Sequence, residues 1–229
     1  MYKRQLREIT DWELPVYVKV GAARVGYDVA LAVKAGADAV VVDGMQGGTA
    51  ATQDIFIEHA GVPTLPAVRQ AVEALQELEM HRKVQLIVSG GIRHGADVAK
   101  ALALGADAVS LGTASLIALG CNRPDYVEDY HALGTEPGFC HHCHTGRCPV
   151  GITTQDADLE TRLNPEQGAR RLRNYLTTMT LELQTLARAC GKSHVLNLEP
   201  EDLAAVTVEA AAMAQVPLAG TDWIPGRSR

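Results

Sequence analysis

The stretch Val84-Gln-Leu-Ile-Val-Ser-Gly-Gly91 decides the fold class of this chain of 229 residues. Its apolar residues form a nearly continuous run that stops at two glycines, as in a strand that is buried on both faces and ends in a loop. Similar runs stand at Val16–Val20, Ala39–Asp43 and Ala108–Leu111. Helix-like stretches separate these runs. Apolar strands that alternate with helices predict an α/β protein with a parallel sheet covered on both faces.

The region 13–112 holds one further candidate strand, Val62-Pro-Thr-Leu-Pro66, which its two prolines make short and irregular. We therefore predict about five βα units, with helices at Gly26–Ala35, Ala67–Lys83 and Ala96–Leu104. A spacing of about 20–25 residues per unit suits either a (β/α) barrel or an open doubly wound sheet. Five strands cannot close an eight-stranded barrel, so either the rest of the barrel is missing or the sheet is open.

The C-terminal region, residues 156–229, is predicted to be a helical extension. Residues 165–190 have the period of one long helix, and Pro200–Ala210 is predicted as another because Pro and acidic residues stand at its start. The long helix carries an apolar stripe, which we expect to pack on the domain rather than to serve a cofactor. The stripe consists of Leu172, Tyr175, Leu176, Met179, Leu183 and Leu186.

The composition, with 47% hydrophobic and 21% charged residues, is that of a soluble globular protein. A net charge of −6 argues against a nucleic-acid or anionic-membrane surface. No apolar run approaches the roughly 20 residues that span a bilayer. Five cysteines, mostly in one loop, do not fit a secreted disulfide framework, so we expect a cytoplasmic protein.

The first residues, Met1-Tyr-Lys-Arg-Gln5, resemble a translated adapter sequence. We therefore expect residues 1–12 to be an artefactual or linker start, with the natural sequence beginning near Leu6.

Two loops, one βα unit apart, carry the pattern of an anion site. Ser89-Gly-Gly-Ile-Arg-His-Gly95 and Leu111-Gly-Thr-Ala-Ser115 each lead from a strand into a helix. Glycines let backbone N–H groups approach an anion, and helix N-termini favour negative charge. Two such loops predict a phosphate-bearing cofactor, to which an arginine adds a charge-assisted contact. The candidate ligands are Gly90, Gly91, Arg93, Gly112 and Thr113.

Three further residues at predicted strand ends are candidates for the same site. Lys19 stands at the end of the first strand, where a lysine is ordinarily solvated or salt-bridged. If a flavin lies across the barrel mouth, a lysine at this point can stabilise the negative charge on its reduced ring. Asp43 and Gln46 follow the second strand and are expected to line the same mouth, although Asp43 serves equally well as a loop cap.

The stretch Gly138-Phe-Cys-His-His-Cys-His-Thr-Gly-Arg-Cys-Pro-Val-Gly151 places three cysteines in nine residues, and Cys121 stands upstream. Thiolates so close in sequence converge on an iron–sulfur cluster or on zinc. The candidate metal ligands are Cys121, Cys140, Cys143 and Cys148.

The ordered set of motifs resembles the FMN-binding domain of glutamate synthase from about residue 13 to Cys121, and again from Cys143 to Gln155. The motifs are Val18-Lys-Val20, Asp43-Gly-Met-Gln-Gly-Gly-Thr-Ala-Ala-Thr52, Ile57-Glu-His-Ala-Gly-Val-Pro63, Ser89-Gly-Gly-Ile-Arg-His-Gly95, Gly112-Thr-Ala-Ser-Leu-Ile-Ala-Leu-Gly-Cys121 and Cys143-His-Thr-Gly-Arg-Cys-Pro-Val-Gly-Ile-Thr-Thr-Gln155.

The resemblance implies an eight-stranded (β/α)8 barrel of the TIM type that holds FMN, of which this chain keeps the last five strands. Residues 13–120 would be the partial barrel and residues 121–155 the iron–sulfur loop. The family's three cluster ligands correspond to Cys121, Cys143 and Cys148 and hold a [3Fe–4S] cluster. The segment Asn122–His142 is longer than the family's spacer and adds Cys140, which permits a [4Fe–4S] cluster instead.

The implied activity is the reductive amination of 2-oxoglutarate by ammonia through 2-iminoglutarate, in glutamate biosynthesis. A glutaminase-type or electron-donor subunit is the implied partner. The long spacer also resembles stand-alone subunits that make N-methylglutamate from methylamine and glutamate. Two alternatives of other classes stay open: a non-catalytic interaction module with structural zinc, and a truncated barrel that binds nothing.

Overall fold

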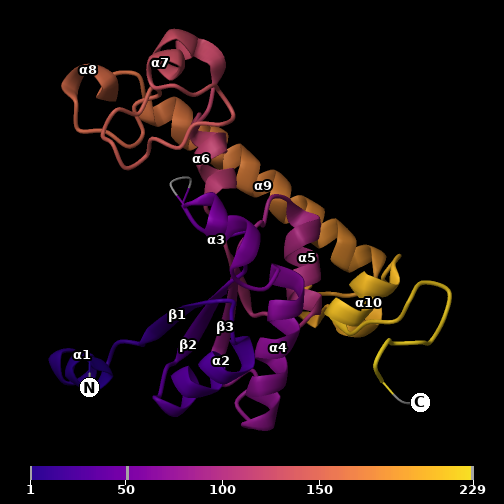
Figure 1. Ribbon diagram of the computed structural model, residues 1–229. Helices are drawn as coiled ribbons and strands as arrows, with labels where there is room; N and C mark the ends of the chain where they lie inside the picture. The colour runs from indigo at the N-terminus through magenta and orange to yellow at the C-terminus, as the bar shows by residue number, and fades with distance from the viewer. Residues whose placement is uncertain (1, 50–51, 228–229) are drawn as a thin grey trace.

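The computed structural model of the chain describes residues 2–49 and 52–227 (Figure 1). The remaining positions include Met1 of the expected linker start and Ala50-Ala51 of the glycine-rich motif, which lie outside the described residues. The first element is helix α1 (Tyr2–Ile9). In Figure 1 it lies beside the start of strand β1 (Tyr17–Gly21).

Within the described residues the sheet has four strands, all parallel, in the order β1-β2-β3-β4. The other three are β2 (Ala39–Asp43), β3 (Gln85–Ser89) and β4 (Ala108–Ser110). The register aligns Gly21, Asp43, Ser89 and Ser110 across the sheet at the carboxyl ends of the strands. The predicted parallel α/β sheet is confirmed, and its sequential strand order is that of a barrel section rather than of a doubly wound sheet.

One face of the sheet is apolar and fully buried. Val40, Val42, Leu86 and Val88 are at most 1% exposed. They pack with buried residues of helices α2 (Val25–Lys34) and α4 (Thr64–Glu77). Burying a Val or Leu side chain stabilises the fold by about 1.5–3 kcal/mol each, so this layer is the main core.

The opposite face of the sheet is more open, which corrects the prediction that both faces are covered. Along β1 and β4 the residues of this face, such as Lys19 and Ser110, are exposed. Because the strands follow one another in order, helices α2 and α4 both fall on the other side. The open face is therefore free to border a ligand cavity.

The segment Val62–Pro66 does not form the predicted strand, so the described residues hold four βα units rather than five. Helices α3 (Asp54–His59) and α4 stand between β2 and β3, and α4 already begins at Thr64. Pro63 and Pro66 flank or occupy its first turn, where a backbone N–H has no partner within the helix. Only Val62 pairs like an extended residue, donating its N–H to the Ala22 carbonyl.

The C-terminal half contains one long helix, α9 (Pro165–Ala189), with Asn164 as its N-cap; the long helix predicted for residues 165–190 is confirmed. It packs against α5 (Gly95–Ala103) and α6 (Thr113–Leu119). In Figure 1 it runs from a small lobe at one end toward α10 at the other. The lobe and C-terminal elements are η1 (Pro124–Tyr126), α7 (Val127–Ala132), α8 (Ala157–Glu160), η2 (Val195–Asn197), η3 (Pro200–Asp202) and α10 (Val208–Ala214).

The helix predicted over Pro200–Ala210 is wrong. Pro200 and the acidic residues begin only the short turn η3, and α10 starts afresh after Thr207, whose hydroxyl accepts the N–H of Ala210. Between them Ala205 bonds with the segment around Pro217, which draws the chain out of the helix. Among the described residues no helix has the length and apolarity to traverse a bilayer.

Candidate functional site

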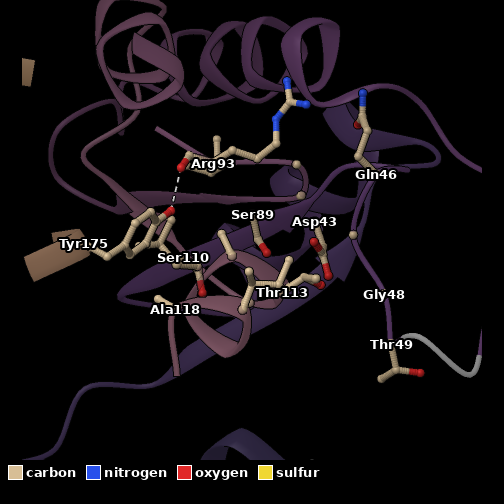
Figure 2. Close-up of a pocket in the computed structure, with 18 of the residues that line it drawn as sticks. Asp43, Gln46, Gly48, Thr49, Ser89, Arg93, Ser110, Thr113, Ala118 and Tyr175 are labelled. Carbon is tan, nitrogen blue, oxygen red and sulfur yellow. Dashed lines mark hydrogen bonds between the residues drawn. The ribbon is translucent and has the colours of Figure 1, made fainter. Parts of the chain in front are cut away.

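A cavity of about 1010 Å³ opens at the carboxyl ends of the four strands. This volume is at the upper end of the range for small-molecule and cofactor sites. All eight predicted cofactor residues line it, although they come from four separate stretches of sequence. They are Lys19, Asp43, Gln46, Gly90, Gly91, Arg93, Gly112 and Thr113. Figure 2 shows the side chains of Asp43, Ser89 and Ser110 at the strand ends bordering this space.

Lys19 and Asp43 form an ion pair inside the cavity mouth. The Lys19 Nζ atom lies 2.8 Å from Asp43 Oδ2, and the Lys19 side chain is 61% exposed while that of Asp43 is 16% exposed. Asp43 Oδ1 is buried without a hydrogen-bond partner among the described residues. The pair therefore holds a protonated amine at a fixed place on the open face of the sheet, with the carboxylate behind it.

Gln46 connects the cavity to the start of helix α4. Its Oε1 atom accepts the backbone N–H of Thr64 at 2.9 Å. The hydroxyl of Thr64 lies 2.8 Å from both Gln46 Oε1 and the Gly90 carbonyl oxygen. The side-chain oxygen of Gln46 thus stabilises the loops that shape the cavity, which leaves its amide nitrogen as the group for a ligand.

The glycines of the two loops serve different purposes. Gly90 and Gly91 have φ values of 104° and 75°, which favour glycine, and a Cβ atom on either would meet Gly44 or Gln46 at about 3.0 Å. Their missing side chains let this loop pack closely against the loop that follows β2. A Cβ on Gly112, in contrast, would meet no atom within 4 Å. Gly112 is therefore the position where backbone borders open cavity, as an approaching anion requires.

The N-terminus of α5 is already occupied by carboxylates. The N–H of Gly95 donates to Glu182 Oε2 at 2.8 Å, and the N–H of Arg93 donates to Asp97 Oδ2 at 3.0 Å. The groups left to bind an anion in the cavity are thus the Gly112 loop and the Arg93 guanidinium. That side chain is 75% exposed, and its only ion pair among the described residues is the one with Asp97, at 3.8 Å.

Helix α9 contributes three cavity residues that sequence reasoning missed: Arg171, Asn174 and Tyr175. The Tyr175 hydroxyl donates to the Arg93 carbonyl at 2.6 Å (Figure 2). Burial, followed by the carboxylates Asp97 and Glu182, raises the pKa of Tyr175, so the hydroxyl stays a donor. The predicted packing stripe is confirmed for Met179 and Leu183, which are buried, and for Tyr175, which packs against them; Tyr175 also lines the cavity, which the stripe did not predict.

The four candidate metal ligands lie in or at the edge of the lobe beyond α6, where Cys140 packs against Cys148. Cys121 follows the end of α6, and its N–H donates to the Leu116 carbonyl at 2.9 Å. Burial, followed by the neighbouring thiols of Cys143, Cys148 and Cys140, raises the pKa of Cys121 to about 11. Cys121 thus interacts electrostatically with the other three thiols, although it lies 19 residues before Cys140 in the chain.

Cys148 has the environment of a thiolate ligand. It is 8% exposed, and burial opposes its ionisation. The backbone N–H groups of Thr153, Val150 and Ile152, together with the Thr153 hydroxyl, outweigh that penalty and lower the pKa of Cys148. Among the described residues the Thr153 hydroxyl makes no hydrogen bond, so it acts on the sulfur as a nearby dipole. Burial raises the pKa of Cys140.

Arginines tie the lobe together. Arg162 pairs with Asp129 at 2.9 Å, donates to the Pro149 carbonyl and lies over the Tyr126 ring. In the part of the chain that the structure describes, no three His, Cys, Asp or Glu side chains are placed to hold one metal ion. Thiolates are the ligands of iron–sulfur clusters, and the backbone N–H groups around Cys148 stabilise a thiolate at that position.

A sequentially ordered parallel sheet with a cofactor-sized cavity at its carboxyl edge defines a ligand-binding (β/α) protein. Beyond that class, the chain belongs to the family described as a conserved region in glutamate synthase, whose model matches residues 1–193. The predicted family is thereby confirmed.

Two curated relatives place the chain within longer proteins. Over 97% of its length, the chain is 69% identical to a glutamate synthase large subunit-like protein of Rhizobium meliloti (strain 1021), and the matched region covers 50% of that protein. Over 85% of its length, it is 40% identical to the archaeal glutamate synthase [NADPH] of Methanocaldococcus jannaschii, and the matched region covers 35% of that protein. The chain thus spans half or less of these relatives. Among solved structures, a mutant flavocytochrome b2 with benzoylformate aligns with a TM-score of 0.47 and 20% identity, over 86% of this chain and 36% of that one.

Proposed function

We propose that this chain is the cofactor-binding part of a glutamate synthase-like oxidoreductase that binds FMN and an iron–sulfur cluster. The observation that carries the proposal is the single cavity lined by all eight predicted cofactor residues. We further propose that sequence beyond this chain supplies the strands that complete a (β/α)8 barrel, because β1 and β4 are both edge strands of the described sheet.

The proposed reaction is the reductive amination of 2-oxoglutarate by ammonia. When bound, FMN would supply hydride to the carbon of 2-iminoglutarate, and the cluster would supply electrons one at a time. Lys19 holds a proton on Nζ next to Asp43, where positive charge opposes the negative charge of a reduced ring. Arg93 and the Gly112 loop bind the phosphate, and the Tyr175 hydroxyl fixes the backbone that carries Arg93.

The four thiols of the lobe support the cluster, and Cys140 permits four irons rather than three. A second candidate reaction, N-methylglutamate synthesis from methylamine and glutamate, is favoured by the enlarged segment 122–142, which forms its own helix α7. Assays with ammonia and with methylamine separate the two. We expect a glutaminase-type or electron-donor subunit as partner and a cytoplasmic location.

Substituting Arg93 tests the phosphate site. Arg93→Gln removes the guanidinium without disturbing a tight contact, because its pair with Asp97 is long and exposed. Charge-assisted hydrogen bonds contribute about 1.5–3 kcal/mol, so we expect FMN to bind about 10- to 100-fold more weakly. Riboflavin, which lacks the phosphate, should bind with unchanged affinity. Both are measured by quenching of flavin fluorescence on titration with protein.

Arg24→Gln is the matched control. Arg24 also forms an i,i+4 pair, with Asp28 at 3.5 Å, and is also 75% exposed, but it does not line the cavity. We expect this variant to bind FMN like the unsubstituted protein. Equal loss of FMN and riboflavin in Arg93→Gln, or wild-type protein that binds neither, would contradict the proposed site.

A further inference from the structure

Tyr130 is a buried polar residue of the cysteine lobe that the proposed function has not used. It belongs to α7 and is 1% exposed. Its hydroxyl has no hydrogen-bond partner among the described residues. A buried hydroxyl without a partner loses its water and gains nothing in return, so such groups are rare in folded proteins and ask for an explanation.

The Tyr130 side chain packs with candidate metal ligands. Tyr130 forms one buried cluster with Cys148 and Val150, and Cys140 packs against it. The thiols of Cys140, Cys121 and Cys148 all act electrostatically on the phenol. Two of the four thiols thus pack with Tyr130, and a third acts on it electrostatically, while its hydroxyl has no acceptor among the described residues.

A sulfur that carries negative charge is the acceptor this environment offers. Thiolates and inorganic sulfides of iron–sulfur clusters accept hydrogen bonds, and these bonds withdraw negative charge from the cluster. The added electron makes the reduced cluster more negative than the oxidised one. A donor near sulfur thus stabilises the reduced state more and raises the reduction potential.

We propose that the Tyr130 hydroxyl donates a hydrogen bond to a sulfur of the iron–sulfur cluster and raises its reduction potential. The assignment rests on the proposed function, since it takes the cluster as present. Tyr130 is a tuning residue: it ligates no iron, and no bond to it forms or breaks when one electron enters the cluster. It stands in the enlarged segment 122–142, so that insertion would adjust the potential as well as add Cys140.

The test is a redox titration of the anaerobically purified protein, followed by electron paramagnetic resonance. In Tyr130→Phe we expect full iron and sulfide content. At any fixed potential, the ratio of reduced to oxidised cluster should fall roughly tenfold, which corresponds to about 59 mV for one electron. An unchanged potential in a variant that holds its cluster would overturn the proposal.

Tyr126→Phe is the matched control, because Tyr126 lies four residues away and packs against the same lobe. Its hydroxyl already has a partner, Arg123 Nη2 at 3.3 Å. We expect its potential to equal that of the unsubstituted protein, and an equal shift in both variants would overturn the assignment to Tyr130.

A second variant keeps the test decisive if Tyr130→Phe loses its cluster. 3-Fluorotyrosine, encoded at position 130 alone, keeps the ring and makes the hydroxyl a stronger donor. It should move the potential upward, opposite to phenylalanine, and a downward or absent shift would contradict the proposal. Wild-type protein without iron–sulfur absorbance contradicts the proposed function itself, which distinguishes the two failures.

Discussion

The buried hydroxyl of Tyr130 also affects how the stability of the protein depends on pH when no metal is bound. Burial, followed by the thiols of Cys140, Cys121 and Cys148, raises the pKa of Tyr130 to about 12, from an ordinary value of 10. The folded state therefore holds this proton more tightly than the unfolded state. The resulting stability is fully present below pH 10 and is lost as the pH rises from 10 to 12.

We predict that Tyr130→Phe in cluster-free protein abolishes this alkaline loss, which amounts to about 2–3 kcal/mol. Near neutral pH the variant should be as stable as the unsubstituted chain, or more stable by about 1 kcal/mol, because it no longer buries an unpaired hydroxyl. Urea unfolding at pH 8 and pH 11.5 measures both effects. Tyr126→Phe should keep the alkaline loss, and an identical loss in Tyr130→Phe would refute the pKa assignment.

At the residue scale, sequence located the groups that stand directly after strands. Lys19, Asp43 and the two glycine loops line one cavity because parallel strands deliver their carboxyl ends to a common edge. Tyr175 and Tyr130 lay beyond such reasoning. Each stands at an ordinary helical position, and its surroundings depend on how α9 or α7 packs, which no local pattern encodes.

At the scale of elements, two close contacts join α9 to the start of α5. A Cβ atom added to Gly95 would stand 2.5 Å from the Met179 carbonyl oxygen and 2.7 Å from the Leu183 nitrogen. Both are backbone atoms, so no side-chain rotation can relieve the contact. The contact between the helices thus requires glycine, and the Gly95 N–H donates to Glu182 at the same place.

We predict that Gly95→Ala forces the two helices apart and destabilises the fold by about 1–3 kcal/mol. Gly26→Ala is its control, since Gly26 lies in helix α2 and an added Cβ would be 3.8 Å from the nearest atom, Gln70 O. That variant should gain up to about 1 kcal/mol, because alanine favours the helix. Urea denaturation compares them, and a stable Gly95→Ala variant would disprove the close packing.

The elements predicted wrongly share one physical cause. Prolines at Val62–Pro66 and Pro200 are compatible with a strand edge, a helix start and a short turn alike. The choice among these was made by distant partners: Ala22 and Gln46 for the first segment, and Pro217 for the second. Where the apolar pattern was long, as a run in β2 and β3 or a stripe in α9, the local sequence sufficed to predict the element.

At the scale of the whole molecule, the N-terminal segment is attached to the sheet by a buried arginine. Arg7 is 9% exposed. Its guanidinium donates to the Leu14 carbonyl at 2.8 Å and to the Gly36 carbonyl at 3.4 Å, and pairs with Asp38. These bonds connect α1 to the loop that precedes β2. A mere linker would not bury a charge in this way, because an ion leaves water only when it is paired.

We therefore predict that Arg7→Ala lowers the free energy of unfolding by about 1–3 kcal/mol, because two carbonyl groups and a carboxylate lose a charged partner. Arg4→Ala, three residues earlier on the same helix, is the matched control. Arg4 pairs with Glu8, and its side chain is 82% exposed. Exposed i,i+4 pairs contribute about 0.3–0.5 kcal/mol to stability. Thermal and urea unfolding of both variants provide the comparison. If both substitutions prove equally harmless, residues 1–12 behave as the linker that the sequence predicts; if only Arg7→Ala destabilises, α1 folds as part of the domain.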